Sequence, residues 1–459
     1  MRLVPLVIAG LVLMACTTDS DVRQEVNAIT GSPGSVPRNL IIMIGDGMGP
    51  AQVSAFRAFQ DDPETVAVET LPVDSILVGN VRTKSMGAPW VVVDSAAAAT
   101  AYATGQPTWN EVVGLDASGE PLETLFERAR RQDMGVGIAV TSEVTHATPA
   151  SFLAHVDYRK KYARIADQLF DNQIDGRPIA DILLGGGRTH LQREDRNLVG
   201  EFENAGYRIA MTASELTQSA GSDLVLGLFA PRGLPAAWDR DPTIPSLAEM
   251  TRFALESLSG NRNGFVLLVE GSQIDWAGHD NQIAKLMSEM GDFMDAIEVA
   301  LDFAEADGET LVMITADHET GGLSLGVEDH PFVADEAYVW DPRPLQQLDG
   351  TPLGMVIGME PGQSLLEAAT HYFPFELDAA ERELLTNAGS GEDAVVALNL
   401  ILDRRTGTGW STGGHTGVDV PLYAYGPGSE ALRGSHASEA VGIRLNQLMF
   451  ADRGQAAER

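Results

Sequence analysis

Cysteine is almost absent from this sequence, which contains only Cys16 among its 459 residues. A chain with one cysteine cannot form an intrachain disulfide, so its fold must be stabilised by its core, by bound ligands or by oligomerisation. Hydrophobic residues make up 44% of the chain, which is enough for a large core. This composition, with its 47 glycines in no fibrous repeat, excludes a disordered or collagen-like protein.

Basic residues are scarce, because 31 Lys and Arg oppose 65 Asp and Glu and leave a formal net charge of −34. Such a charge disfavours nucleic acid or an anionic membrane as a structural partner. The acids are dispersed along the chain, which is typical of a solvated surface. An anionic substrate must therefore be attracted by a local site against the overall field.

The apolar run at the N-terminus, Leu3–Ala15, is too short to span a bilayer but suits the core of an export signal. Its end, Leu13-Met14-Ala15-Cys16, resembles the lipobox at which bacterial lipoproteins are cleaved and acylated. The sequence predicts a signal peptide at 1–15, a flexible tether at 16–37, and an exported protein anchored to the bacterial envelope by lipid on Cys16, facing the periplasm or the exterior. The alternative is an ordinary signal with an incidental cysteine.

From about residue 38, short apolar runs alternate with helical patterns, which favours an α/β fold of three layers with a central, mostly parallel sheet between helices. The strongest helical pattern covers Ile283–Phe303. We expect one catalytic domain over 38–450, with strands at Leu40–Ile44, Gly135–Val140, Ile182–Leu184, Phe265–Val269 and Leu311–Thr315.

The regular pattern loosens between Gly322 and Trp410, where prolines and turns are frequent. Structureless loops of more than about 15 residues are uncommon, so we expect an inserted subdomain at 323–410. Its apolar residues exceed what a solvated loop would expose, which favours a contact between subunits of a homodimer. A subdomain that buries these residues internally is the alternative.

Three of the apolar runs end in an acid, namely Asp46, Glu270 and Asp317. Ligands of open α/β sheets bind at the carboxyl ends of the strands, so these carboxylates are expected to converge. One such acid would more often cap a helix, but three of them indicate a site.

Histidines lie close to two of these acids. Asp275 and His279 are four residues apart, which places both side chains on one helix face where they could hold a metal. His318 directly follows Asp317, and His415 lies in a glycine-rich turn. Mixed His and Asp sets suit zinc, and oxygen sets suit magnesium.

A candidate nucleophile, Ser95, follows the apolar run Val91–Val93 and begins an alanine-rich helical pattern. The run predicts a strand that leads into the helix, and a helix N-terminus favours anions. A plain N-cap serine is the alternative.

Seven short motifs occur in the order seen in the alkaline phosphatase family, which the chain resembles from about Arg38 to Pro427: Asp46-Gly47-Met48-Gly49, Asp94-Ser95-Ala96-Ala97, His146-Ala147-Thr148-Pro149-Ala150, Leu184-Gly185-Gly186-Gly187-Arg188, Glu270-Gly271, Thr315-Ala316-Asp317-His318-Glu319 and Gly414-His415-Thr416-Gly417. The resemblance implies hydrolysis of phosphate monoesters through a phosphorylated Ser95, at two zinc ions and one magnesium. It also implies that Arg159, positioned by Asp94, clamps the phosphate, and that the protein is a homodimer.

The same resemblance implies the ligands of each metal. The first zinc would be bound by Asp275, His279 and His415. The second would be bound by Asp46, Asp317, His318 and the Ser95 oxygen. The magnesium would be bound by Asp46, Thr148 and Glu270, with His146 beside it.

Two positions depart from the enterobacterial members, since His146 stands where they have a carboxylate and Trp276 where they have a lysine. His146 resembles the animal branch, and Trp276 with the long insertion resembles marine bacterial members. The metal of the third site is therefore left open. A phosphodiesterase of the same superfamily and a lipoprotein that binds metal or phosphate without turnover are the alternative functions.

Overall fold

The computed structural model describes residues 36–450 apart from 63–64, 66–68, 89 and 334–337. The expected signal peptide, Cys16 and nearly all of the tether therefore lie outside the described residues. In the part of the chain that is described, no helix has both the length and the apolar character needed to cross a bilayer.

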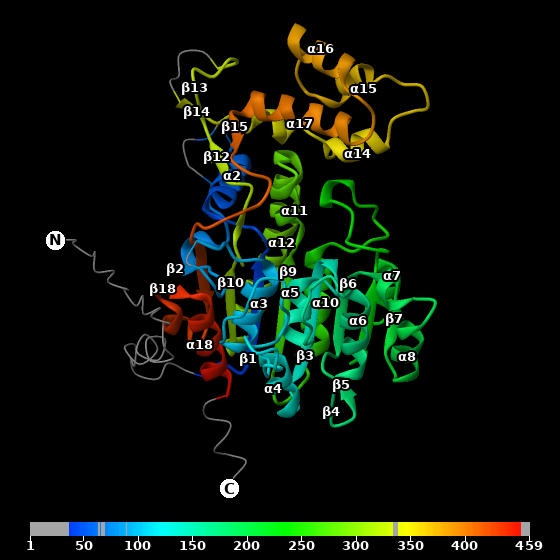
Figure 1. Ribbon diagram of the computed structural model, residues 1–459, viewed down its shortest axis with the longest axis vertical. Coiled ribbons are helices and arrows are strands. Elements are labelled where there is room, and N and C mark those ends of the chain that lie inside the picture. Colours follow the sequence, from blue (N-terminus) through cyan, green and yellow to red (C-terminus); the bar gives the residue numbers. More distant parts are fainter. Residues whose placement is uncertain (1–35, 63–64, 66–68, 89, 334–337, 451–459) are drawn as a thin grey trace, which may run out of the picture.

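A ten-stranded sheet forms the centre of the fold (Figure 1). Its strands follow the order β18 (Gly434–Ala437), β2 (Leu77–Arg82), β17 (Val420–Tyr425), β10 (Thr310–Thr315), β1 (Asn39–Gly45), β9 (Phe265–Gly271), β3 (Gly135–Glu143), β6 (Ile182–Gly186), β8 (Val225–Leu228) and β7 (Arg208–Ala210). Within this sheet β17 is antiparallel to both of its neighbours, and the other pairs are parallel. The expected mostly parallel α/β sheet is confirmed.

Helices cover the sheet because its central strands are apolar on both faces and need protein on each side. Helices α10 (Leu247–Leu258) and α12 (Ile283–Asp307) pack against the central strands. A second group of helices is centred on α3 (Ser95–Thr104). Helices α5 (Ala147–Leu153) and α18 (Ser438–Phe450) both pack against it. Helix α12 continues four residues beyond the expected end and stops before Gly308, whose φ of 70° ends the helix in the left-handed conformation.

The segment expected as an insertion leaves and re-enters through the antiparallel pair β12 (Leu323–Leu325) and β15 (Thr408–Trp410). Between them lie α13 (Arg343–Gln346), α14 (Pro352–Ile357), α15 (Leu365–Tyr372), α16 (Ala379–Asn387) and α17 (Glu392–Thr406). Figure 1 shows α14 to α17 grouped beyond one end of the sheet, and α17 contacts α12. The expected domain boundaries themselves stay a prediction.

Candidate active site

The three acids at strand ends lie on neighbouring strands. Strand β1 pairs with β10 on one side and with β9 on the other, so the carboxyl ends of all three strands meet. Asp46 follows β1, Glu270 lies near the end of β9, and Asp317 follows β10. All three side chains are fully buried, which brings unusual negative charge to one place in the fold.

Three groups of potential metal ligands surround these acids, each with its ligand atoms within 4.8 Å of one another. The first consists of Asp275, His279 and His415; the second of Asp46, Asp275 and His318; and the third of Asp46, His146 and Glu270. Seven of the ten residues expected as ligands belong to these groups, and Ser95, Thr148 and Asp317 do not. The metal-binding roles of all ten stay predictions.

The first group is built on α11 (Gln273–His279), which carries Asp275 and His279. The spacing of four residues brings His279 Nε2 to 3.4 Å from Asp275 Oδ2. The helix approaches β1 closely at Gly47, whose φ is +76°, where a side chain would collide with the Asp275 backbone. Glycine at this position is therefore a condition for the site.

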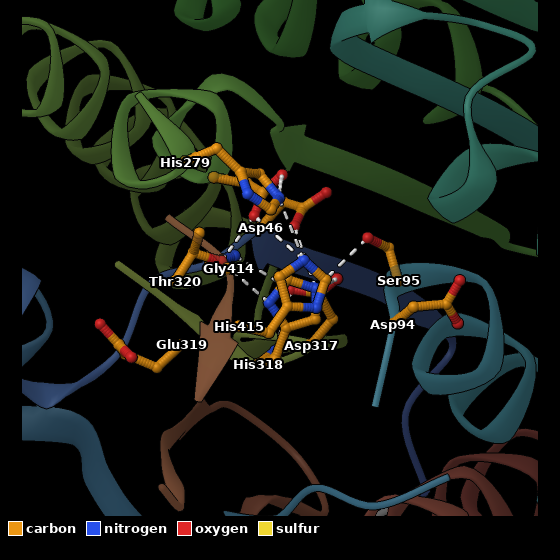
Figure 2. A network of polar contacts seen from close by, with 12 residues as sticks. Asp46, Asp94, Ser95, His279, Asp317, His318, Glu319, Thr320, Gly414 and His415 are labelled. Carbon is orange, nitrogen blue, oxygen red and sulfur yellow. Dashed lines mark hydrogen bonds and ion pairs between the residues drawn. The ribbon is translucent and has the colours of Figure 1, made fainter. Parts of the chain in front are cut away.

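His318 and His415 lie face to face at the centre of the site (Figure 2), with their ring centroids 3.5 Å apart. His318 directly precedes β11 (Glu319–Thr320), and His415 is the first residue of β16 (His415–Thr416). These two strands form an antiparallel pair. Asp317 Oδ2 lies 3.1 Å from His318 Nε2, but the second group contains Asp275 rather than the expected Asp317.

Ser95 is the first residue of α3, and its Oγ lies 3.3 Å from His318 Nε2 (Figure 2). Asp94 caps the helix by accepting a hydrogen bond from the Ala97 N–H at 3.0 Å. Ser95 therefore faces the metal-binding groups from the positive end of a helix dipole. The expected strand before it is wrong: residues 91–93 have no strand pairing.

Asn110, rather than a neighbouring strand, binds the backbone of this extended segment. Its side chain accepts a hydrogen bond from the Asp94 N–H at 3.0 Å and donates one to the Val92 carbonyl at 2.8 Å. Nothing in the local sequence pattern marks Asn110 for this role, because its two partners lie sixteen and eighteen residues away.

Arg159 lies beside the nucleophile candidate. It donates through Nη1 to Asp94 Oδ2 at 2.9 Å, and its Nη2 lies 3.3 Å from His146 Nε2. Asp94 also accepts from the Glu111 N–H at 2.9 Å, so the carboxylate that orients the guanidinium is itself fixed. The expected link between Arg159 and Asp94 is present.

The electrostatics of the acids indicate a need for cations. Burial, and then the charges of Asp317 and Asp275, raise the pKa of Asp46 well above its usual range. Burial raises the pKa of Glu270 to about 8. Three buried carboxylate oxygens have no hydrogen-bond partner among the described residues, namely both oxygens of Asp46 and Oε1 of Glu270. Buried carboxylates without donors suit metal ions.

His146 of the third group directly precedes α5. Thr148 in the first turn of that helix has a buried Oγ1 that is also without a hydrogen-bond partner in the described chain. Burial and the nearby Arg159 lower the pKa of His146 to about 3, which keeps this ring neutral. The ring of Trp276 meets the His146 ring edge to face, with centroids 6.0 Å apart. Both positions that depart from the enterobacterial pattern are thus in contact.

Comparisons with known proteins agree with this geometry. A family model described as alkaline phosphatase matches residues 37–450. Alkaline phosphatase 3 of Bacillus subtilis (strain 168) is 43% identical over 403 residues, which cover 86% of each chain. The repressible alkaline phosphatase of Saccharomyces cerevisiae is 33% identical, covering 90% of this chain and 81% of that protein.

Solved structures resemble the fold as well. The crystal structure of a cold-active alkaline phosphatase from a psychrophilic Shewanella species has a TM-score of 0.81 and 38% identity, covering 90% of this chain and 99% of that one. A magnesium-bound TAB5 alkaline phosphatase variant, in which aspartate replaces a histidine, has a TM-score of 0.66 and 26% identity, covering 91% and 99%.

Proposed function

This chain belongs to the alkaline phosphatase family, a family of metal-dependent enzymes, and we propose that it hydrolyses phosphate monoesters through a phosphorylated Ser95. The observation that carries the proposal is the position of Ser95 Oγ, 3.3 Å from a histidine of the metal-binding groups. A protein that only bound phosphate would need no hydroxyl at the start of a helix beside those groups.

We propose two zinc ions and one magnesium as the cofactors. The mixed Asp and His groups have the donor types of zinc sites, and the group around Glu270 and Thr148 has the oxygens that magnesium prefers. When bound, these ions neutralise the buried acids and stabilise negative charge on the hydroxyl, the phosphate and the leaving oxygen. The chain has the residues to hold them: Asp46, His146, Thr148, Glu270, Asp275, His279, Asp317, His318 and His415.

The serine hydroxyl acts in two steps. Ser95 Oγ gives up its proton to solvent and forms a bond to phosphorus as the bond to the ester oxygen breaks, and the leaving oxygen takes a proton from solvent and departs as the alcohol. A water molecule then attacks the phosphoserine, which releases inorganic phosphate and restores the hydroxyl. The backbone N–H groups at the start of α3 favour the anionic phosphoryl group in both steps.

Arg159 binds two oxygens of the phosphate with its planar guanidinium, which suits bidentate contact better than an ammonium does. Its hydrogen bond to Asp94 at 2.9 Å keeps the group oriented. Burial alone would lower the pKa of the guanidinium, but the charge and hydrogen bond of Asp94 raise it, so the group stays charged. Because Ser95 directly follows Asp94, the residue that orients Arg159 also adjoins the nucleophile.

The proposal is tested with p-nitrophenyl phosphate and bis(p-nitrophenyl) phosphate as competing substrates. We expect the monoester to be cleaved at least a hundred times faster than the diester, and Ser95→Ala to lose at least 10³-fold in kcat, an order of magnitude typical of a lost nucleophile. Ser54→Ala, an exposed helical serine, is the control and should keep full activity.

Acid quenching during turnover identifies the intermediate. We expect mass spectrometry of the quenched enzyme to find phosphate on Ser95. Phosphate on another residue, or preferential cleavage of the diester, would contradict the proposal.

We also propose export, a lipid anchor on Cys16 and a homodimer. These rest on the N-terminal sequence pattern and on the resemblance to dimeric family members. Mass spectrometry of the membrane-extracted protein would find an acylated Cys16 as its first residue, and an unmodified cysteine there would refute the anchor.

A further inference from the structure

Glu319 is a buried carboxylate for which the proposed chemistry has no use. Its side chain is only 3% exposed, and within the described chain it forms no ion pair. It accepts four hydrogen bonds instead. Oε1 accepts from Gln52 Nε2 at 2.7 Å and from the Leu323 N–H at 3.3 Å, and Oε2 accepts from the Gly322 N–H at 3.2 Å and from the Thr416 hydroxyl.

These donors come from the segments that carry the metal-binding residues. Gln52 lies in α2 (Pro50–Gln60), six residues after Asp46. Glu319 itself follows His318, and Thr416 follows His415. The turn before α2 is packed so tightly on Glu319 that a side chain at Gly49 would come within 2.2 Å of its Cγ.

The neighbouring residue of β11 reaches the site from the opposite side of the strand, because successive side chains alternate. Thr320 donates to Asp275 Oδ1 at 2.5 Å, and its hydroxyl lies 3.2 Å from His318 Nδ1. Figure 2 shows Glu319 directed away from the histidines and Thr320 directed among them. Any rotation of this strand would therefore move ligands of the first and second groups together.

We propose that Glu319 is a positioning residue that fixes the spacing of the two zinc-binding groups by joining the backbones that carry Asp46, His318 and His415. The inference rests on the proposed function. Its physical basis is that a buried carboxylate is tolerated only when its hydrogen bonds are satisfied. All four donors must then stay in place, which fixes the relative positions of three segments that are distant in the sequence.

The test measures zinc affinity in the full-length protein. Wild type and Glu319→Gln are stripped of metal and titrated with zinc against a chromogenic chelator. The amide of the variant presents its NH₂ to at least one of the groups that now donate to Glu319, so at least one of the four hydrogen bonds is lost. We expect zinc to bind at least tenfold more weakly, as is typical when groups behind the ligands are removed.

Glu289→Gln is the matched control, because Glu289 is equally buried, at 1% exposed, and lies in α12 outside the three metal-binding groups. Its zinc affinity should stay within about twofold of wild type. The visible spectrum of the cobalt-loaded enzyme is a second readout, and we expect it to change in Glu319→Gln alone. Wild-type affinity and spectrum in Glu319→Gln would overturn the proposal.

A second variant keeps the test decisive if Glu319→Gln does not fold. Gln52→Met leaves the carboxylate intact and removes one of its four donors at similar volume, together with the hydrogen bond from the same amide to the Thr320 carbonyl at 2.9 Å. We expect a threefold to tenfold loss of zinc affinity. Unchanged affinity in this variant would also overturn the proposal. If wild type itself neither binds zinc nor cleaves the monoester, the proposed function fails instead, so the two failures are distinguishable.

Discussion

At the scale of single residues, His146 is the member of the third group that we expect to influence which metal binds there. Its ring stays neutral because burial and Arg159 lower its pKa to about 3, so it cannot offset the positive charge of a metal as a carboxylate would. A solved TAB5 variant has aspartate in place of a histidine and magnesium bound. The corresponding type of change in this chain, histidine to aspartate at position 146, therefore tests which metal the third site prefers.

We therefore predict that His146→Asp raises magnesium affinity at the third site by about tenfold, because it supplies a hard oxygen ligand. The measurement is activity as a function of magnesium concentration in the zinc-loaded enzyme. His190→Asp, which changes a half-buried histidine stacked on Tyr162, is the control. Equal activation of wild type and His146→Asp would show that His146 does not act on that metal.

Several site residues could be predicted from sequence because their signals are local. Asp46, Glu270 and Asp317 end apolar runs, and Asp275 and His279 are spaced by one helical turn. Asn110 and Glu319 could not be found in this way. Their roles depend on partners in segments that are remote in sequence and meet only in the folded chain.

At the scale of elements, the central strands were predicted correctly because a strand buried on both faces must be apolar throughout. The same rule failed at 91–93, where Val93 is buried but Val91 is 38% exposed. Three β-branched residues favour an extended backbone, but only long-range pairing makes that backbone a strand. Helices α13 to α16 of the insertion, which have four to nine residues, were missed because each is too short for a clear period. Helix α17, with 15 residues, was missed as well.

A hydrogen bond from Tyr102 helps to fix helix α3 to the end of the strand that precedes the metal-binding residues. The Tyr102 hydroxyl donates to the Ala316 carbonyl at 2.8 Å, and Ala316 directly precedes Asp317. Tyr102 is completely buried. The bond therefore joins the helix that begins with Ser95 to the strand that precedes Asp317 and His318.

We predict that Tyr102→Phe lowers the free energy of unfolding by about 1–2 kcal/mol, because a buried carbonyl loses its donor, and lowers kcat several-fold. Tyr207→Phe is a matched control, since the Tyr207 hydroxyl donates to the Ala180 carbonyl at 2.6 Å and is also buried. Urea unfolding should find a similar loss of stability in both variants. The idea is refuted if both also have the same kcat.

At the scale of the whole molecule, a chain with a single cysteine and three acids buried in one place is expected to depend on bound metal for its stability. Metal that binds only the folded state stabilises it, by roughly 3–4 kcal/mol per site when the free metal exceeds Kd by 100- to 1,000-fold. Without metal, three carboxyl groups, Asp46, Glu270 and Asp317, are buried in one place. Burial raises the pKa of Asp46 and of Glu270, so the metal-free fold must either bury their charge or take up protons.

We therefore predict that EDTA abolishes activity and lowers Tm by several degrees, and that zinc with magnesium restores both. Calorimetry provides the measurement, and EDTA already saturated with calcium is the control for effects of the chelator itself. An unchanged melting curve in excess EDTA would mean that these acids do not hold metal in the native protein.

The insertion divides its apolar residues between the interior and the surface. Leu348 and Phe373 are buried within it, but Ile357 is 74% exposed, and Val396 and Leu400 are 56% and 52% exposed. Val396 and Leu400 lie four residues apart in α17, so they form one apolar face of that helix. The buried part is a small core, and the exposed part is the surface that a second subunit would cover.

We predict that Leu400→Glu converts a dimer to a monomer and lowers activity, because association would bury an unpaired charge in an apolar contact. Light scattering at micromolar protein measures the mass. Val36→Glu is the control, since Val36 is 47% exposed and precedes β1, outside the insertion, and this variant should stay dimeric. A Leu400→Glu protein that remains dimeric and fully active would mean that α17 faces solvent in the assembly and that the insertion serves another purpose.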